Sequence, residues 1–106
     1  MNHLDKEVLE KFKGLLLKRE GLNKLILFGS RARGDAAPSS DMDVVVIWEA
    51  ELDEGIREYI SDCAWEAGFE SGIVIVPVIF SKEEWTNGPE RSSLLVQAVE
   101  REGLAV

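Results

Sequence analysis

Residues 28–43 read FGSRARGDAAPSSDMD, and this stretch joins two apolar runs. The run before it, KLILFG at 24–29, is short and suits a buried strand. The run after it, DVVVIW at 43–48, is apolar at every position past the first, as expected for the central strand of a sheet that is covered on both faces. The stretch therefore places a Gly-Ser pair at the end of one strand and two aspartates at the start of the next.

The Gly-Ser pair is suited to binding phosphate. Gly29 closes the first strand, and Ser30 opens SRAR, a segment compatible with a helix. A helix start leaves backbone N–H groups unpaired, and glycine lets the backbone approach a phosphate closely. The Ser30 hydroxyl can donate to a phosphate oxygen, and Arg31 or Arg33 beside the turn could face the phosphates.

The two aspartates are suited to a hard metal ion. Asp41 and Asp43 stand two residues apart at the entry to a strand, so their side chains share one face. Mg²⁺ takes one or two carboxylates together with substrate phosphate oxygens and water. Next to a phosphate-binding turn, the pair predicts a site for a nucleoside triphosphate and its metal ion.

Each half of this pattern also has an ordinary structural interpretation. Gly-Ser is a common turn pair, and SDMD at 40–43 can be a cap at a strand entry. A turn and a cap do not need two arginines, nor two acids on one face where a buried strand begins. Burying carboxylates is costly unless a cation or hydrogen bonds compensate. Spacing alone leaves both interpretations open.

Size and charge narrow the functional class. The 106 residues, 45% hydrophobic and 30% charged, predict a single domain over 1–106 with a modest core, which a partner or self-association into a homo-oligomer could supplement. The net charge of −8 opposes nonspecific binding to a nucleic-acid polymer. It still allows a small anionic ligand at a locally cationic site, and it suits a basic partner protein.

Three features predict a cytoplasmic protein without a membrane segment. The longest apolar stretch, at 72–80, is far shorter than the roughly 20 residues of a membrane helix. The N-terminal segment is charged and amphipathic, unlike a secretion signal. The single cysteine, Cys63, fits a reducing interior.

Helical spacing predicts two amphipathic helices. The first covers 3–20 and is expected to end at Gly21. The second covers 51–67 and is expected to stop at Gly68. Both would pack an apolar stripe on the sheet.

The second half of the chain adds a strand and two helices. GIVIVPVIF at 72–80 predicts a third strand, in which Pro77 indicates a sheet edge or a bend. Ser81 and Glu84 have the form of a capping box at the start of a short helix. A last helix is expected over 90–102. The predicted fold is therefore α/β, a small sheet flanked by helices in the order αββαβαα.

Several large apolar side chains are expected to face the core. Leu94, Leu95, Ala98 and Val99 are expected on the inner side of the last helix. Trp48, Trp65 and Trp85 are expected to pack on the core as well, although one of them could face a partner.

The block GSRARGDAAPSSDMD at 29–43 resembles the signature of the DNA polymerase beta-like nucleotidyltransferase superfamily, in which Gly-Ser is followed by a spacer and Asp-x-Asp. The short chain resembles the minimal nucleotidyltransferases (MNT), and GIVIVPVIFSKEEW and EREGL are similar to the rest of such domains. The resemblance implies a mixed, palm-like sheet flanked by helices. It also implies transfer of a nucleoside monophosphate, with AMP from ATP favoured, to a hydroxyl group and release of pyrophosphate.

The resemblance implies a role for each residue of the block. Gly29 and Ser30 would hold the triphosphate, and Arg33 is a further candidate phosphate contact. Asp41 and Asp43 would bind Mg²⁺ and act in catalysis.

One part of the family pattern is missing. Active members usually carry a third carboxylate on the next core strand, where it helps to hold metal and deprotonates the acceptor. The strand at 72–80 has no Asp or Glu, and Glu70 just before it is the nearest candidate. Without a third acid, a partner could supply the base, or catalysis could be weak or lost, whereas nucleotide binding would survive.

Two functions therefore stay open. The first is a Mg²⁺-dependent nucleotidyltransferase that modifies a protein or small-molecule hydroxyl. The second is an antitoxin-like binding module that neutralises a HEPN-type helical partner, with a degenerate or regulatory nucleotide site. Some relatives pair with such a toxin and modify it with AMP. Turnover that Asp43→Asn abolishes would separate the two functions.

Overall fold

The structure is a computed structural model that describes residues 2–89 and 93–106. The predicted order of elements is confirmed, with two short additions, α2 and β4. In chain order the elements are α1 (His3–Leu16), β1 (Leu22–Phe28), α2 (Ser30–Arg33), β2 (Met42–Trp48), α3 (Glu54–Phe69), β3 (Ile75–Ser81), α4 (Lys82–Asn87), α5 (Leu94–Glu102) and β4 (Leu104–Ala105).

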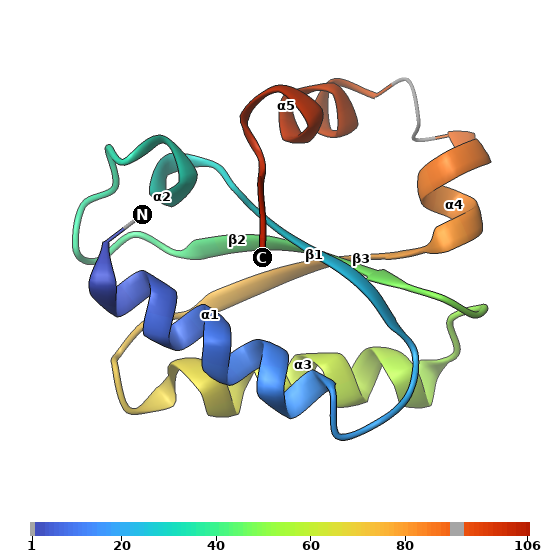
Figure 1. Cartoon of the computed structure of the whole chain (residues 1–106), viewed down its shortest axis with the longest axis horizontal. Helices are drawn as coiled ribbons and strands as arrows, with labels where there is room; N and C mark the ends of the chain where they lie inside the picture. The colour runs from blue at the N-terminus through green and yellow to red at the C-terminus, as the bar shows by residue number, and fades with distance from the viewer. Residues whose placement is uncertain (1, 90–92) are drawn as a thin grey trace.

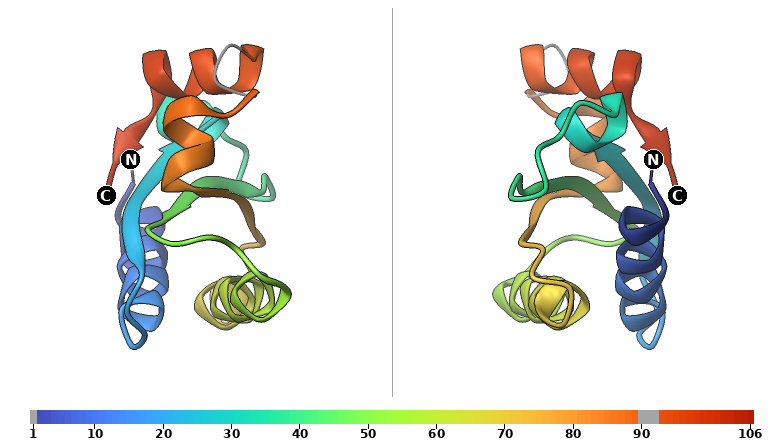
Figure 2. Two further views of the ribbon diagram at one scale, coloured as in Figure 1. Left: turned by 90° about the vertical axis from the view of Figure 1, so that its right-hand side faces the viewer. Right: turned by 90° about the vertical axis from the view of Figure 1, so that its left-hand side faces the viewer.

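A mixed sheet of four strands forms the middle layer, with α1 and α3 on one face and α4 and α5 on the other (Figures 1 and 2). The strand order is β3-β2-β1-β4. β1 runs antiparallel to β2 and to β4, and β2 runs parallel to β3. The mixed, helix-flanked sheet is thus the fold that was predicted. No helix in the described residues has the length and apolar character needed to cross a membrane.

β2 is the central strand because both of its faces are apolar. Val44 and Val46 pack in the core under α1 and α3, whereas Val45 and Ile47 pack in the core under α4 and α5. β3 lies at the edge of the sheet, where Pro77, which has no N–H to offer a further strand, is tolerated. Both positions agree with the predictions from the sequence.

Two glycines that were expected to end helices have a different role. α1 ends before Gly21, whose φ is 137° and whose Cβ, if present, would lie 2.3 Å from the ring of Trp48. α3 continues past Gly68, where a Cβ would lie 2.0 Å from the carbonyl oxygen of Ile73. Each glycine permits close packing. The predicted end of the first helix is wrong, whereas the second helix ends at Phe69, within one residue of the predicted stop at Gly68.

The inner face of α5 agrees with the prediction at Val99 and differs from it at Leu94 and Leu95. Leu94 is 85% exposed and Leu95 is 38% exposed, whereas Val96 and Val99 are buried against the sheet. Ser93 caps the helix by accepting a bond from the Val96 N–H, which sets the helix register. The first predicted residues of this helix, 90–92, lie outside the described residues.

The three tryptophans have different surroundings. Trp48 is 2% exposed, and Trp85 packs edge-on against Phe80 with ring centroids 5.2 Å apart. Trp65 is 68% exposed on α3. The expectation that tryptophans pack on the core is therefore wrong for Trp65.

Candidate active site

The Gly-Ser turn and the aspartate pair meet at one end of the sheet. Phe28, the last residue of β1, pairs with Asp43 on β2, so Gly29 follows directly beside this aspartate. A Cβ at Gly29 would lie 2.8 Å from Asp43 Oδ2. The structure thus brings the two halves of the sequence pattern into contact.

The turn after β1 depends on glycine. Gly29 has φ 77° and ψ −156°, a conformation that other residues adopt only with strain. Ser30 begins the single turn of α2, and the Arg33 N–H donates to the Gly29 carbonyl at 3.1 Å. Gly34, with φ 82°, ends α2 in a left-handed conformation. The backbone therefore passes close to Asp43 and turns away within a few residues.

Asp41 and Asp43 interact electrostatically. Asp41 is exposed and Asp43 is half-buried at the start of β2. Burial raises the pKa of the Asp43 carboxyl, and the negative charge of Asp41 raises it further. Two hard-oxygen ligands that repel each other are a donor set that fits Mg²⁺, because a divalent cation relieves both the repulsion and the burial cost.

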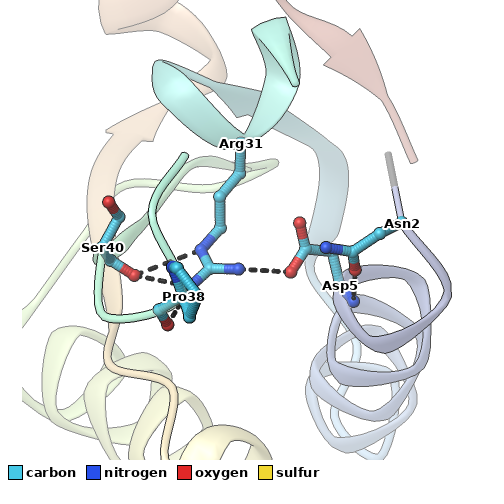
Figure 3. A network of polar contacts seen from close by, with 5 residues as sticks. All are labelled: Asn2, Asp5, Arg31, Pro38 and Ser40. Atoms are coloured by element: carbon cyan, nitrogen blue, oxygen red, sulfur yellow. Dashed lines mark hydrogen bonds and ion pairs between the residues drawn. The ribbon is translucent and has the colours of Figure 1, made fainter. Parts of the chain in front are cut away.

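Arg31 has a structural role and does not face the turn. It is 4% exposed, and its Nη1 donates to Asp5 Oδ1 of α1 at 2.5 Å (Figure 3). Its Nη2 donates to the carbonyls of Pro38 and Ser40 at 3.2 and 2.7 Å. One guanidinium therefore anchors the loop that leads to Asp41.

Asp5 is a residue that sequence reasoning missed. It is 2% exposed and shares the buried face of α1 with Val8, Leu9 and Phe12. An acid at helical spacing within an apolar stripe was the available signal. Such an acid needs a partner because an unpaired buried charge is costly.

Arg33 remains a candidate phosphate contact, but in this structure it is engaged elsewhere. Its Nη1 donates to Glu102 Oε2 of α5 at 3.0 Å, and its Nε donates to Asp35 Oδ2 at 3.3 Å. These hydrogen bonds raise the pKa of the Arg33 guanidinium, and the bond to Glu102 contributes most. The side chain is 47% exposed, so it can leave these partners for a ligand.

Glu70 is not brought to the aspartate pair. It caps the C-terminus of α3 with its side chain 83% exposed, and its carboxylate lies 3.7 Å from Lys11 Nζ. Among the described residues, no three His, Cys, Asp or Glu side chains could jointly hold a metal ion. The register partner of Asp43 on the parallel strand β3 is Val76. A valine therefore occupies the position beside Asp43 at which a third carboxylate was expected.

Comparison with known proteins identifies the family. The family model described as "Nucleotidyltransferase domain" matches residues 8–106. The chain belongs to the nucleotidyltransferase domain family. The nucleotidyltransferase resembles two proteins of Methanocaldococcus jannaschii, which confirms that it is an enzyme of this class. "Putative protein adenylyltransferase MJ0604" is 32% identical over 80 residues, 74% of this chain and 75% of that protein. "Putative protein adenylyltransferase MJ0141" is 31% identical over 78 residues, 72% of this chain and 79% of that protein.

Solved structures share the fold of this nucleotidyltransferase. A toxin-antitoxin complex with AMP-PNP matches with a TM-score of 0.62 and 20% identity, over 95% of this chain and 70% of that chain. A complex of the tri-AMPylated Shewanella oneidensis HEPN toxin with MNT antitoxin matches with a TM-score of 0.57 and 20% identity. The match covers 96% of this chain and 70% of that chain. These solved structures show that the chain has the same fold.

Proposed function

We propose that this nucleotidyltransferase transfers AMP from ATP to a hydroxyl group of a protein, with Mg²⁺ held by Asp41 and Asp43. The observation that carries the proposal is the close approach of the Gly29 backbone to Asp43, where an added Cβ would lie 2.8 Å from Oδ2. It places a turn suited to phosphate beside a pair of carboxylates suited to Mg²⁺. The names of the curated relatives support a protein acceptor and adenylyl transfer. The AMP-PNP and AMPylated complexes with the same fold support the nucleotide.

Each residue of the site has a separate task. Gly29 lets the triphosphate approach the backbone, and the Ser30 hydroxyl donates to a phosphate oxygen. Arg33 can add a cation once it leaves Glu102. Asp41 and Asp43 would hold Mg²⁺. The ion would neutralise negative charge on the α-phosphate and on the leaving pyrophosphate.

The transfer itself exchanges one phosphorus–oxygen bond for another. The acceptor oxygen forms a bond to the α-phosphorus, the bond from that phosphorus to pyrophosphate breaks, and the hydroxyl proton leaves. Among the described residues, no third His, Cys, Asp or Glu side chain joins Asp41 and Asp43 in a metal-binding cluster. We expect the proton to pass to a group on the acceptor protein or to solvent.

Val76 favours a second function. A site with valine beside Asp43 can bind nucleotide and metal and still be slow in transfer. In this alternative the protein is an antitoxin-like module that neutralises a HEPN-type helical partner by contact, and the nucleotide site is regulatory. The complexes of HEPN toxins with MNT antitoxins of the same fold support it.

Calorimetric titration of ATP, with and without Mg²⁺, tests the nucleotide site. We expect Mg²⁺-dependent binding by the wild type and its loss in Asp41→Ala/Asp43→Ala. Asp62→Ala, which removes an exposed acid from α3, is the matched control and should bind as the wild type does. Unchanged ATP binding by the double variant would show that Asp41 and Asp43 only cap the start of the strand.

A transfer assay separates the two functions. ATP labelled at the α-phosphate should leave label on a protein acceptor with wild type and not with Asp43→Asn. Mg²⁺-dependent binding without any transfer, in the presence of a HEPN-type partner, would favour the binding module.

A further inference from the structure

A cluster of exposed apolar side chains lies where α3 leads into β3. Trp65 and Phe69 on α3 are 68% and 65% exposed, and their rings pack at a tilt of 51° with centroids 5.3 Å apart. Val74, in the loop that leads into β3, is 58% exposed. Single exposed apolar residues are ordinary, but three of them together mark an interaction surface.

These side chains border a groove between α3 and the edge strand β3. The groove encloses about 380 Å³. Trp65 and Phe69 form one wall, Val74 and Pro77 form the other, and Gly68 lies in between. Because a Cβ at Gly68 would collide with the Ile73 carbonyl, the absence of a side chain there lets the loop after α3 approach the helix. The described residues leave this apolar groove open to solvent.

The groove and the Asp43 side chain lie on opposite faces of the sheet. Ile75 lines the groove and packs in the core under α1 and α3. Asp43 shares a face of β2 with Val45 and Ile47, which pack in the core under α4 and α5. A protein segment seated in the groove would therefore leave the nucleotide site open.

Charge indicates what kind of segment fits. Glu66 and Glu70 line a second hollow together with Trp65 and Phe69, and Asp62 precedes them at helical spacing on α3. Lys11 is the one cation that lines this hollow. A second copy of this chain would bring two acidic rims and two net charges of −8 together. A segment with positive flanks would instead meet complementary charge.

We propose that this groove docks a partner protein through a segment that presents apolar side chains flanked by lysine or arginine. The docking needs neither nucleotide nor metal. Apolar anchors supply the affinity, and the acidic rim selects basic flanks.

Binding of designed peptides to the whole chain tests the proposal. The probe is a fluorescent peptide of about 15 residues with leucines at helical spacing and lysines elsewhere, long enough to form a helix. Two control peptides carry glutamate in place of lysine, or the same leucines and lysines in scrambled order. We expect the lysine peptide to bind, with both controls at least about tenfold weaker.

Matched variants locate the binding. Trp65→Ser/Phe69→Ser should weaken the lysine peptide at least about tenfold. Leu94→Ser on α5, which removes a more exposed apolar side chain outside the groove, should leave binding unchanged. Glu66→Lys/Glu70→Lys should reverse the preference in favour of the glutamate peptide. All of these positions are exposed, and thermal melting should confirm that the variants fold.

Three results would overturn the proposal. They are equal binding of the lysine and glutamate peptides, unchanged binding by the Trp65→Ser/Phe69→Ser variant, and a wild-type dimer in sedimentation that the same variant dissociates. The last would assign the groove to a second copy. Mg²⁺-dependent ATP binding is measured on the same variants and should be unchanged, so failure of the groove is distinguishable from failure of the nucleotide site.

Discussion

Arg31 on α2 and Asp5 on α1, 26 residues apart in the chain, form a buried ion pair. Their side chains are 4% and 3% exposed, and the same guanidinium binds the carbonyls of Pro38 and Ser40. The pair thus ties the first helix to both ends of the loop that delivers Asp41. We expect the aspartate pair to depend on this anchor although Arg31 touches no ligand.

Arg31→Met should destabilise the protein by about 3–5 kcal/mol, because Asp5 would remain buried without a partner. Urea unfolding measures this loss. Asp5→Leu/Arg31→Met should recover part of it, since no buried charge then remains unpaired. Arg33→Met, on the exposed neighbouring arginine, is the control and should change stability little. Equal effects of the two arginine variants would contradict a structural role for Arg31.

The raised pKa of Asp43 predicts an opposite pH dependence for stability and for metal binding. The folded protein without metal favours the protonated carboxyl of Asp43, because its folded pKa is higher than its unfolded pKa of about 3.9. This group therefore contributes its whole stabilisation of the folded state below the unfolded pKa, and the contribution is lost as pH rises through the folded pKa. Mg²⁺ requires the ionised form. Its affinity should rise about tenfold per pH unit below the pKa of Asp43 and level off above it.

Calorimetric titration of Mg²⁺ over a pH series checks the metal-binding profile, and urea unfolding over the same series checks stability. Asp43→Asn should lose the metal-binding profile and should be slightly more stable than the wild type near neutral pH. A Mg²⁺ affinity that stays flat across the acidic range would show that this carboxyl is not a ligand.

The parts of the site that lie close together in the chain were predictable from the sequence. Gly29, Asp41 and Asp43 fall within one strand–loop–strand unit, and the apolar runs on each side set their positions. The long-range partners were not predictable, because packing of separate helices determines them. Asp5 meets Arg31 only when α1 packs on the sheet, and Glu102 meets Arg33 across 69 positions.

The errors in the predicted elements come from signals that have two physical meanings. Glycine can mark the end of a helix, and it can also mark a place where another part of the chain packs directly on the backbone. At Gly21 and Gly68 the second meaning applies, because Trp48 and the Ile73 carbonyl occupy the space of a side chain. In α5 the helical spacing placed Val99 correctly, but in the first turn Val96 is the buried residue and Leu94 and Leu95 are exposed. Trp65 is exposed because the cores on the two sheet faces are complete without it.

Gly29→Ala should damage the site and the fold together. The φ of 77° strains any other residue by about 1–3 kcal/mol, and the new Cβ would lie 2.8 Å from Asp43 Oδ2. We expect that loss in urea unfolding and at least about tenfold weaker ATP binding with Mg²⁺ in calorimetry. Gly14→Ala is the matched control. A Cβ at Gly14 meets nothing within 4 Å, so this variant should be more stable by about 0.5–1 kcal/mol and should bind ATP normally.

Glu102→Gln should strengthen ATP binding if Arg33 contacts the phosphates. In the structure without ligand, Glu102 holds the Arg33 guanidinium at 3.0 Å, and ATP would have to compete for it. Weakening an exposed pair should raise the ATP affinity roughly threefold, whereas Arg33→Gln should lower it. Both effects should shrink at high salt in calorimetric titrations. A gain in Glu102→Gln that persists when Arg33 is also replaced would place the effect outside this pair.

Val76→Asp should supply the carboxylate that the site lacks. Val76 is the register partner of Asp43 on the neighbouring parallel strand and is 37% exposed, so the new side chain would stand next to the pair. Like-charge repulsion should destabilise the protein without metal by about 1 kcal/mol and make its stability more dependent on Mg²⁺. If proton removal limits transfer, the rate should rise by about 100-fold or more.

Val76→Asn places a neutral polar side chain of similar shape at the same position and is the control for charge. It should not reproduce the gain in transfer or the tighter Mg²⁺ binding, because an amide does not take up the acceptor proton and carries no charge that attracts the ion. A gain in both variants would trace the effect to a polar side chain at this position. A gain in Val76→Asp alone would show that the nucleotide and metal parts are competent and that the general base is the missing element. No gain in transfer, with Mg²⁺ binding tightened, would place the base on the acceptor protein.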